Sequence, residues 1–258
     1  MKSILFEKKG HVGIITLNCP EDHNALSLEL MDEMQKQLDL IAKDRDTRVI
    51  VIRGNGPAFC TGHNINELVG EEYDIKHFRN VFSVCSNLMQ TLQKTPQPVI
   101  AQVHGAALAA GCQLVAACDL AIADTKTKFS TPGVKIGLFC STPMVPLSRV
   151  IGRRRALDML LTGRFVSAQE AEKFGLINKI AEPENLSKET ENWAEEIAKF
   201  SLFTLELGKK AFYHQTDLDE GSAYDYAKEA IANNCLSEDA QEGMKAFLEK
   251  RKPEWKGR

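Results

Sequence analysis

Residues 103–123 read VHGAALAAGCQLVAACDLAIA, and this stretch decides the fold because small apolar residues fill most of it. A strand-like run ends at Val103, a turn rich in alanine and glycine follows, and an apolar helix then leads into a second strand. Near Ala109 or Ala110, the first backbone N–H groups of the helix have no intrahelical acceptor and can point at an anion. The stretch therefore predicts a buried strand–turn–helix unit, with Gln113 as the polar residue inside the helix.

The same succession of strand, loop and helix occurs elsewhere in the first half of the chain. Residues 4–17, ILFEKKGHVGIITL, predict two strands joined at Lys9 and Gly10, and Ser27 is placed to cap the helix that follows. Buried strands are also predicted over 48–53, 98–103 and 119–124, and a helix over 74–94. This recurrence before residue 125 indicates an α/β fold, a layered spiral of repeated units.

The pattern changes near residue 184. From there to residue 250 the sequence is mostly helical in period and rich in Glu and Lys, and no strand is predicted after INKIA at 177–181. We therefore expect a domain boundary near 195, with a core over 1–195 and a helical C-terminal region over 196–258. A region of this kind packs on its own core or on a neighbouring subunit.

The composition is that of a soluble globular protein. Hydrophobic residues make up 43% and charged residues 26% of the 258, and the formal net charge of −3 argues against a chain built mainly to bind nucleic acid. The seven cysteines form no C-x-x-C pair, which favours reduced thiols over disulfides or a zinc site. Near the N-terminus only a short apolar run separates Lys2 from the charges at 7–9, and prolines and glycines interrupt the uncharged run 95–118. We therefore predict a cytoplasmic protein with no membrane span and no metal.

Two loops share a chemical feature. FCTGHNI at 59–65 and VHGAALAAG at 103–111 both leave a buried strand and pass through glycine. If the loops lie side by side, one N–H from each can hold a thioester oxygen as it becomes an oxyanion, and each such donor contributes roughly 2.7–4 kcal/mol in the transition state. Taken alone, the two loops are more typical of a tight packing corner than of an oxyanion hole.

Several motifs taken together resemble the crotonase superfamily, that is, the enoyl-CoA hydratase/isomerase family. Besides the two loops, the similarity rests on Asn24-Ala25-Leu26, on the run TPGVKIGLFCSTP at 131–143 with its continuation to Ile180, and on the ending GMKAFLEKRKPEW at 243–255. The motifs stand in the family's order and span residues 4 to 255. The resemblance implies a spiral of ββα units and a C-terminal helical region that builds trimers, often paired into hexamers.

The resemblance also implies an acyl-CoA site and a role in fatty acid metabolism. By position, the backbone N–H groups of His63 and Ala110 would form the oxyanion hole, with the His63 side chain turned away from the thioester. Coenzyme A is expected as part of the substrate, with no permanently bound cofactor. The positions that correspond to CoA contacts in the family are Asn24, Ala25, Leu26, Gly62, Asn64, Ile65, Phe247 and Lys250, the last two often acting on a neighbouring subunit.

The sequence departs from the family at both hydratase glutamates. Gln113 and Gly133 stand at those positions, and neither side chain transfers a proton at neutral pH. A positioned general acid or base contributes about 10²–10⁴ in rate, so ordinary water addition should be weak. We expect the cavity to be wider at Gly133. Ser141 stands where some isomerases of the family carry Asp, which makes Cys140, Ser141 and Thr142 the nearest candidates for polar groups at the reacting carbons.

Several functions stay open at this point. An acyl-CoA enzyme that needs little carboxylate chemistry, such as a decarboxylase or a thioesterase, fits the missing glutamates. A weak hydratase (a lyase) or isomerase is the second hypothesis, and a non-catalytic acyl-CoA-binding protein is the third, favoured if residues 140–142 point away from the cavity. RNA binding has support only from the short basic clusters at 153–155 and 250–252, which are more typical of solvated faces.

Overall fold

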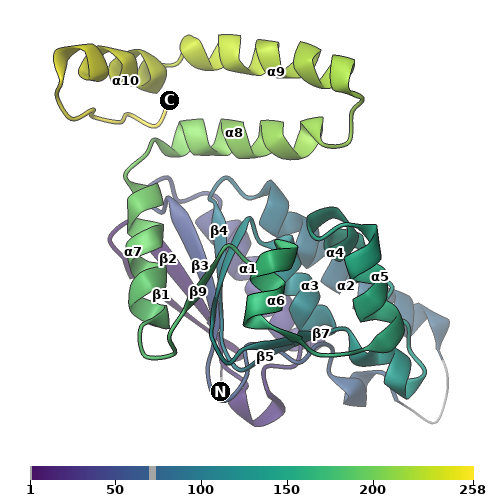
Figure 1. Ribbon diagram of the computed structural model, residues 1–258. Coiled ribbons are helices and arrows are strands. Elements are labelled where there is room, and N and C mark those ends of the chain that lie inside the picture. The colour runs from purple at the N-terminus through teal and green to yellow at the C-terminus, as the bar shows by residue number, and fades with distance from the viewer. Residues whose placement is uncertain (1, 70–73) are drawn as a thin grey trace.

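The computed structural model describes residues 2–69 and 74–258, and a six-stranded sheet lies at its centre (Figure 1). The strands are ordered β1-β2-β3-β4-β6-β9. β1 (Ile4–Lys9) is antiparallel to β2 (Val12–Leu17), and the other strands are parallel to their neighbours: β3 (Val49–Gly54), β4 (Val99–Val103), β6 (Leu120–Asp124) and β9 (Lys179–Ala181). The α/β spiral predicted from the sequence is therefore confirmed.

Helices cover both faces of this sheet. On one face lie α1 (Leu28–Ile41), α2 (Ile75–Lys94) and α3 (Ala110–Ala117), and on the other lies α7 (Leu186–Ala198). Alternate side chains of β3 point to opposite faces of the sheet. Ile50 and Ile52 belong to the larger core, while Val49 and Val51 pack with α7. A strand that is buried on both faces needs a continuous apolar run, which residues 48–53 supply.

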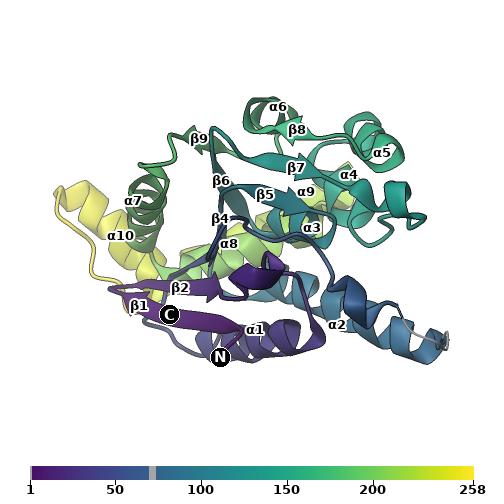
Figure 2. The same ribbon diagram turned by 90° about the horizontal axis from the view of Figure 1, so that it is seen from below.

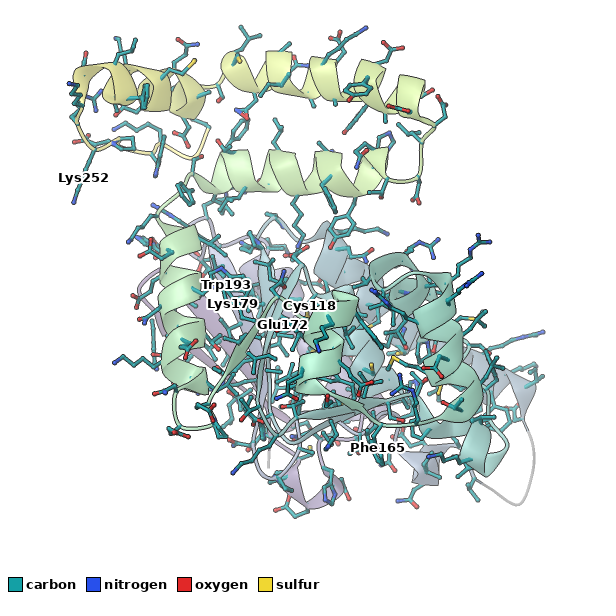
Figure 3. All side chains as sticks on the ribbon, viewed as in Figure 1. Cys118, Phe165, Glu172, Lys179, Trp193 and Lys252 are labelled. Carbon is teal, nitrogen blue, oxygen red and sulfur yellow. The ribbon has the colours of Figure 1, made fainter. Side chains whose placement is uncertain are left out.

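A side-chain cap fixes the start of α1, and a cation–π contact helps attach α7 to the sheet. Ser27 caps α1 as predicted, since its Oγ accepts from the Leu30 N–H at 3.1 Å. The Lys179 ammonium of β9 lies 4.1 Å from the ring centroid of Trp193 on α7, and Figure 3 shows the two side chains next to each other.

A second, three-stranded sheet was not predicted. It consists of β5 (Ala106–Leu108), β7 (Lys128–Ser130) and β8 (Val166–Ser167), and Figure 2 shows it beside α3. These strands hold two or three residues each, too few to display a period of two. The remaining core elements are the 3₁₀ turns η1 (Pro20–Asp22), η2 (Ile65–Glu67) and η3 (Pro132–Ile136), and helices α4 (Met144–Val150), α5 (Arg153–Thr162) and α6 (Ala168–Phe174).

The C-terminal region consists of α8 (Leu202–Gln215), α9 (Glu220–Cys235) and α10 (Glu238–Glu249). Figure 1 shows α8 across one end of the core, with α9 and α10 farther out. Residue 195 lies inside α7, which packs on the sheet, so we propose that the core ends after Ala198 rather than near 195. Large apolar side chains on these three helices remain exposed: Phe212, Tyr224, Ile231, Leu236, Phe247 and Leu248. In the described ranges, no helix has the length and apolarity that a bilayer crossing requires.

A buried ion pair joins α8 to the core. The Lys209 ammonium lies 2.6 Å from the Asp119 carboxylate, and their side chains are 7% and 14% exposed. Asp119 also accepts from the Val99 N–H at 2.7 Å and from the Tyr213 hydroxyl at 2.8 Å, while Lys209 donates to the Leu92 carbonyl at 2.7 Å. Asp119 is the second residue after α3, so this cluster fixes α8 near the C-terminal end of that helix. The N-terminal end of the same helix adjoins the predicted oxyanion loop.

We expect Lys209→Met to lower the free energy of unfolding by about 3–5 kcal/mol, because it leaves the Asp119 carboxylate buried without its cation. Lys210→Met is the matched control, since Lys210 is exposed on the same helix, and it should change stability by no more than about 0.5 kcal/mol. Urea denaturation at one fixed protein concentration measures both variants. Equal stability of the two would show that the buried pair does not hold α8.

Candidate functional site

A cavity of about 960 Å³ lies where loops leave several strands of the core. Its wall comes from residues 21–25, 61–68, 109–110 and 132–143, with Phe82 of α2 completing it. These segments follow β2, β3, β5 and β7, so most of the cavity is built from the carboxyl ends of parallel strands, where ligands commonly bind in α/β proteins. Its volume is in the range of small-molecule sites.

The two loops singled out in the sequence lie side by side at this cavity. The Leu108 N–H donates to the Cys60 carbonyl at 2.9 Å, which ties the first loop to the second. A Cβ built on Gly62 would lie only 2.9 Å from the Ala109 Cβ and 3.2 Å from the Ala110 nitrogen. Gly62 also has a φ of 102°, which side chains rarely adopt. Glycine at this position therefore permits the approach that brings the His63 and Ala110 backbones together.

The start of α3 is held in a strained conformation. Ala109 has φ 47° and ψ −116°, a combination that costs a non-glycine residue about 1–3 kcal/mol, and its N–H donates to the Ser130 carbonyl at 2.9 Å. Neither the His63 N–H nor the Ala110 N–H has an acceptor within residues 2–69 and 74–258. Both residues line the cavity. The loops thus offer two backbone donors that the described chain does not use.

The His63 side chain lies at the wall of the cavity. Its ring packs edge-on against Phe82, with 5.2 Å between the centroids, and both ring nitrogens are buried without a hydrogen-bond partner among the described residues. Burial lowers the pKa of His63, while the nearby Leu26 carbonyl opposes this effect. That carbonyl accepts from the Asn64 N–H at 3.2 Å and forms no hydrogen bond with the ring.

Gln113 and Gly133, where the resemblance leads us to expect the family's two glutamates, both carry uncharged groups. Gln113 is 3% exposed, its Oε1 has no partner among the described residues, and it lies behind Ala110 rather than among the lining residues. Gly133 lines the cavity, but a Cβ built on it would lie 2.6 Å from the Leu138 carbonyl oxygen and 2.8 Å from the Cys140 Sγ. The expectation of a wider cavity at Gly133 is therefore wrong, because the Leu138 backbone and the Cys140 thiol take up this space.

The segment 140–142 faces the cavity. Cys140, Ser141 and Thr142 all line it. Burial raises the pKa of the Cys140 thiol, so the uncharged thiol is favoured, although the nearby Gly133 backbone opposes this shift. The Ser141 hydroxyl is exposed and donates to the Phe139 carbonyl at 3.2 Å, with no base beside it among the described residues. A serine without a base is a poor nucleophile.

The positions expected to contact CoA divide into two groups. Ala25, Asn64 and Ile65 line the cavity, whereas Asn24, Leu26 and Gly62 do not. Asn24 is buried at φ 55°, and its amide donates to the carbonyls of Asn55 and Ala58, both at 2.8 Å. Leu26 donates its N–H to the Gly62 carbonyl at 2.7 Å. In the structure these last residues shape the turn that carries the lining residues.

Phe247 and Lys250 do not line the cavity of their own chain. Phe247 is 82% exposed on α10, and Lys250 ends that helix in the left-handed conformation, at φ 55°. Among the described lining residues, Lys135 is the single lysine or arginine, and its ammonium lies 5.7 Å from the Phe165 ring centroid. Figure 3 shows Phe165 and the C-terminal Lys252 at opposite ends of the molecule.

Part of the cavity wall comes from residues that no sequence motif indicated. Phe82 comes from the middle of α2, and Leu68 follows η2, so neither belongs to the motifs at the strand ends. The helical period over 74–94 predicted α2 but not which of its residues turn toward a loop. In the described ranges, no group of three His, Cys, Asp or Glu side chains is placed to hold a metal ion.

Comparison with known proteins gives consistent matches over nearly the whole chain. The family model described as "Enoyl-CoA hydratase/isomerase" matches residues 7–258. Enoyl-CoA hydratase domain-containing protein 3, mitochondrial, from Xenopus laevis is 46% identical over 93% of this chain and 82% of its own length. Solved structures of an enoyl-CoA hydratase from Mycobacterium smegmatis and of the human domain-containing protein 3 each superpose with a TM-score of 0.95. They are 41% and 43% identical and cover 98% of this chain and 98% and 100% of their own.

The names of the relatives show that the predicted cytoplasmic location is wrong. The relatives from Xenopus laevis, Rattus norvegicus and Homo sapiens are all named mitochondrial proteins, which points away from the cytoplasm. The prediction rested on the absence of disulfide and signal-peptide patterns, and neither observation separates one reducing compartment from another.

We expect Gly133→Ala to destabilise the protein by about 1–3 kcal/mol, because its methyl group would press on the Leu138 carbonyl, a backbone group that must then shift. Gly208→Ala is the control. Gly208 lies in α8 with nothing within 4 Å of a built Cβ, and alanine there should stabilise the helix by about 0.5–1 kcal/mol. Thermal unfolding of both variants shows whether each substitution raises or lowers the melting temperature. If Gly133→Ala left the stability unchanged, the Leu138 backbone would be able to shift, and the cavity wall could accept a larger side chain at residue 133.

Proposed function

Because the chain belongs to the enoyl-CoA hydratase/isomerase family, we propose that it binds acyl-CoA thioesters in this cavity and stabilises a thioester enolate or oxyanion with the N–H groups of His63 and Ala110. The observation that carries the proposal is the pair of unused backbone donors on adjacent loops. Such donors cost nothing to reorganise when negative charge develops on the thioester oxygen, and removing one typically costs about 10²–10³ in rate.

The thioester carbonyl would accept from both N–H groups, with the acyl chain toward Phe82 and the segment 140–142. The CoA moiety would extend out of the cavity past Ala25, Asn64 and Ile65. The described lining residues near this exit include Glu21 and Asp22, both exposed, and few cations. The phosphates of CoA need compensation by cations, so we propose that Lys250, with Phe247, reaches the ligand from a neighbouring subunit. The exposed apolar side chains of α8–α10 are consistent with a homo-oligomer, a trimer or a pair of trimers.

The reaction that suits this site is one that needs little proton transfer by protein side chains. Glu21 and Asp22 at the exit are the carboxylates among the described lining residues, and the inner wall offers a thiol and hydroxyls. Decarboxylation forms the enolate by loss of CO₂ without a protein base, so it fits this wall best. Thioester hydrolysis needs an activated water, and water addition to an enoyl thioester needs an acid and a base.

A second candidate is a protein that binds acyl-CoA without turning it over. The absence of a carboxylate from the described inner wall is compatible with such a protein, but the position of residues 140–142 in the cavity wall counts against it. Weak hydratase or isomerase activity is the remaining alternative. Of the two experiments that follow, the first tests the oxyanion hole and the second tests hydration.

The first experiment tests the oxyanion hole. Proline is tolerated at the first position of a helix, so Ala110→Pro should remove the N–H donor while α3 still forms. Acetoacetyl-CoA is the probe, because its enolate absorbs in the near ultraviolet. Wild type should raise this absorbance on binding, and Ala110→Pro should weaken the effect roughly 10²-fold. Ala110→Ser keeps the N–H and is the control, and circular dichroism checks the fold of both. Undiminished enolate absorbance in a folded Ala110→Pro variant would contradict the proposal.

The second experiment tests the missing glutamates. Loss of the conjugated absorbance of crotonyl-CoA reports hydration, and we expect wild type to be slow because each absent acid or base removes about 10²–10⁴ in rate. Gln113→Glu replaces an amide by a carboxyl of the same shape and should raise the rate. Gln93→Glu, on α2 outside the cavity, should not. Hydration by wild type at a typical enzyme rate of about 1–10³ s⁻¹ would overturn this assignment.

A further inference from the structure

A second cleft, of about 890 Å³, lies at the opposite end of the sheet from the candidate acyl-CoA cavity. Its walls come from the β1–β2 turn, the start of β3, the end of α7 and the C-terminal tail, which we define as residues 251–258. The lining residue Val12 begins β2, and Arg48 directly precedes β3, whereas the acyl-CoA cavity follows the carboxyl ends of these strands. Strands of this length span about 17–20 Å, so the two spaces are separate.

Cations are concentrated around this cleft, although the chain as a whole has a formal net charge of −3. The lysine and arginine residues of its lining are Lys9, Arg48, Lys199 and Lys252, and Glu195 is the single carboxylate among the described lining residues. Lys9 and Lys199 form ion pairs with glutamates outside the lining. Arg48 and Lys252 form no ion pair within residues 2–69 and 74–258. The cleft therefore presents two cations that an anion can neutralise.

Arg48 is held in place by the end of α7. Its Nη1–H donates to the Ala198 carbonyl at 3.1 Å, which is one of the last carbonyls of that helix. This bond uses one of the five N–H donors of the guanidinium, and the others have no acceptor among the described residues. A planar guanidinium with free donors matches two oxygens of a phosphate group at once.

Aromatic side chains form another part of the wall. Phe200 and Trp255 both line the cleft, and Phe200 is 56% exposed. The Trp255 Nε1–H donates to the Lys199 carbonyl at 2.7 Å, which holds the indole beside the end of α7. Flat apolar rings next to cations suit a ligand that carries both an aromatic group and a negative charge.

The C-terminal tail, which supplies Lys252 and Trp255, is fixed by a buried carboxylate. Asp239 of α10 is 1% exposed, and it accepts from the Lys256 N–H at 2.6 Å and from the Gly257 N–H at 3.0 Å. Figure 1 shows the tail turning back along α10. This wall of the cleft is therefore ordered before any ligand arrives, which lowers the entropic cost of binding.

We propose that the second cleft binds a nucleoside phosphate. The phosphate oxygens accept hydrogen bonds from Arg48 and Lys252, and the base stacks on the exposed ring of Phe200. The volume of the cleft is in the range of small-molecule sites. This site goes beyond the proposed acyl-CoA function and does not depend on it.

Isothermal titration calorimetry at low salt and without divalent cations tests the site, with ADP and inorganic pyrophosphate as probes. Wild type should bind ADP with a dissociation constant below about 1 mM. Pyrophosphate has no base to stack, so it should bind about 5-fold more weakly or less well still. If ADP does not bind up to about 1 mM, or if the two probes bind equally, the proposal is overturned.

Arg48→Met should weaken ADP binding about 10–100-fold, because it removes charged hydrogen bonds to the phosphate. Arg48→Lys keeps the charge without the planar fork and should recover part of the affinity. Arg45→Met is the matched control, since Arg45 pairs with Glu206 at 2.7 Å outside the lining, and it should bind ADP as wild type does. Circular dichroism checks that all three variants are folded.

Phe200→Ala tests recognition of the base. It should weaken ADP binding about 5-fold or more and leave pyrophosphate binding unchanged. Phe212→Ala is the control, because Phe212 is also exposed but lies on α8 outside the cleft. CoA itself contains an adenosine phosphate, so ADP could instead occupy the acyl-CoA cavity. In that case a folded Arg48→Met variant would bind ADP like wild type, and this result would overturn the proposal.

Discussion

The close approach of Gly62 to the start of α3 is the constraint on which the candidate site depends. A side chain at residue 62 would collide with Ala109 and crowd the Ala110 nitrogen, so the two loops meet only because that position lacks a Cβ. The meeting point is also where Ala109 adopts a strained backbone conformation, held by its hydrogen bond to Ser130. Strain of this kind persists when the surrounding structure enforces it, here through the parallel sheet and the short strands β5 and β7.

Uncharged groups stand at the two positions where the resemblance to the family leads us to expect glutamates. The amide of Gln113 preserves the shape of a glutamate, whereas the space beside Gly133 is taken by the Leu138 carbonyl and the Cys140 thiol. The two departures therefore differ physically. One is a change of a single functional group, and the other is a rebuilt wall in which a larger side chain has no room. An uncharged inner wall next to two backbone donors suits stabilisation of an enolate more than delivery of protons.

The C-terminal helices are coupled to this site through the far end of α3. Lys209 and Tyr213 of α8 bind Asp119, the second residue after α3, while the other end of α3 carries the Ala110 N–H. Helices α9 and α10 add little buried surface of their own and expose several large apolar side chains. A region that is firmly attached at α8 and poorly buried beyond it is suited to packing against further copies of the chain.

The sequence by itself determined the α/β spiral, because hydrophobic period and chain breakers act over a few residues and are visible in RVIVIR, PVIAQV and the capped helix at Ser27. It also located the two loops, since glycine and alanine at strand ends restrict what the backbone there can do. Only the tertiary structure decided the rest. The collision at Gly133, the contact of His63 with Phe82 and the burial of Asp119 against Lys209 join residues far apart in the chain. Such contacts depend on how whole helices, strands and loops pack against one another. A local pattern of residues does not specify which distant residues will meet.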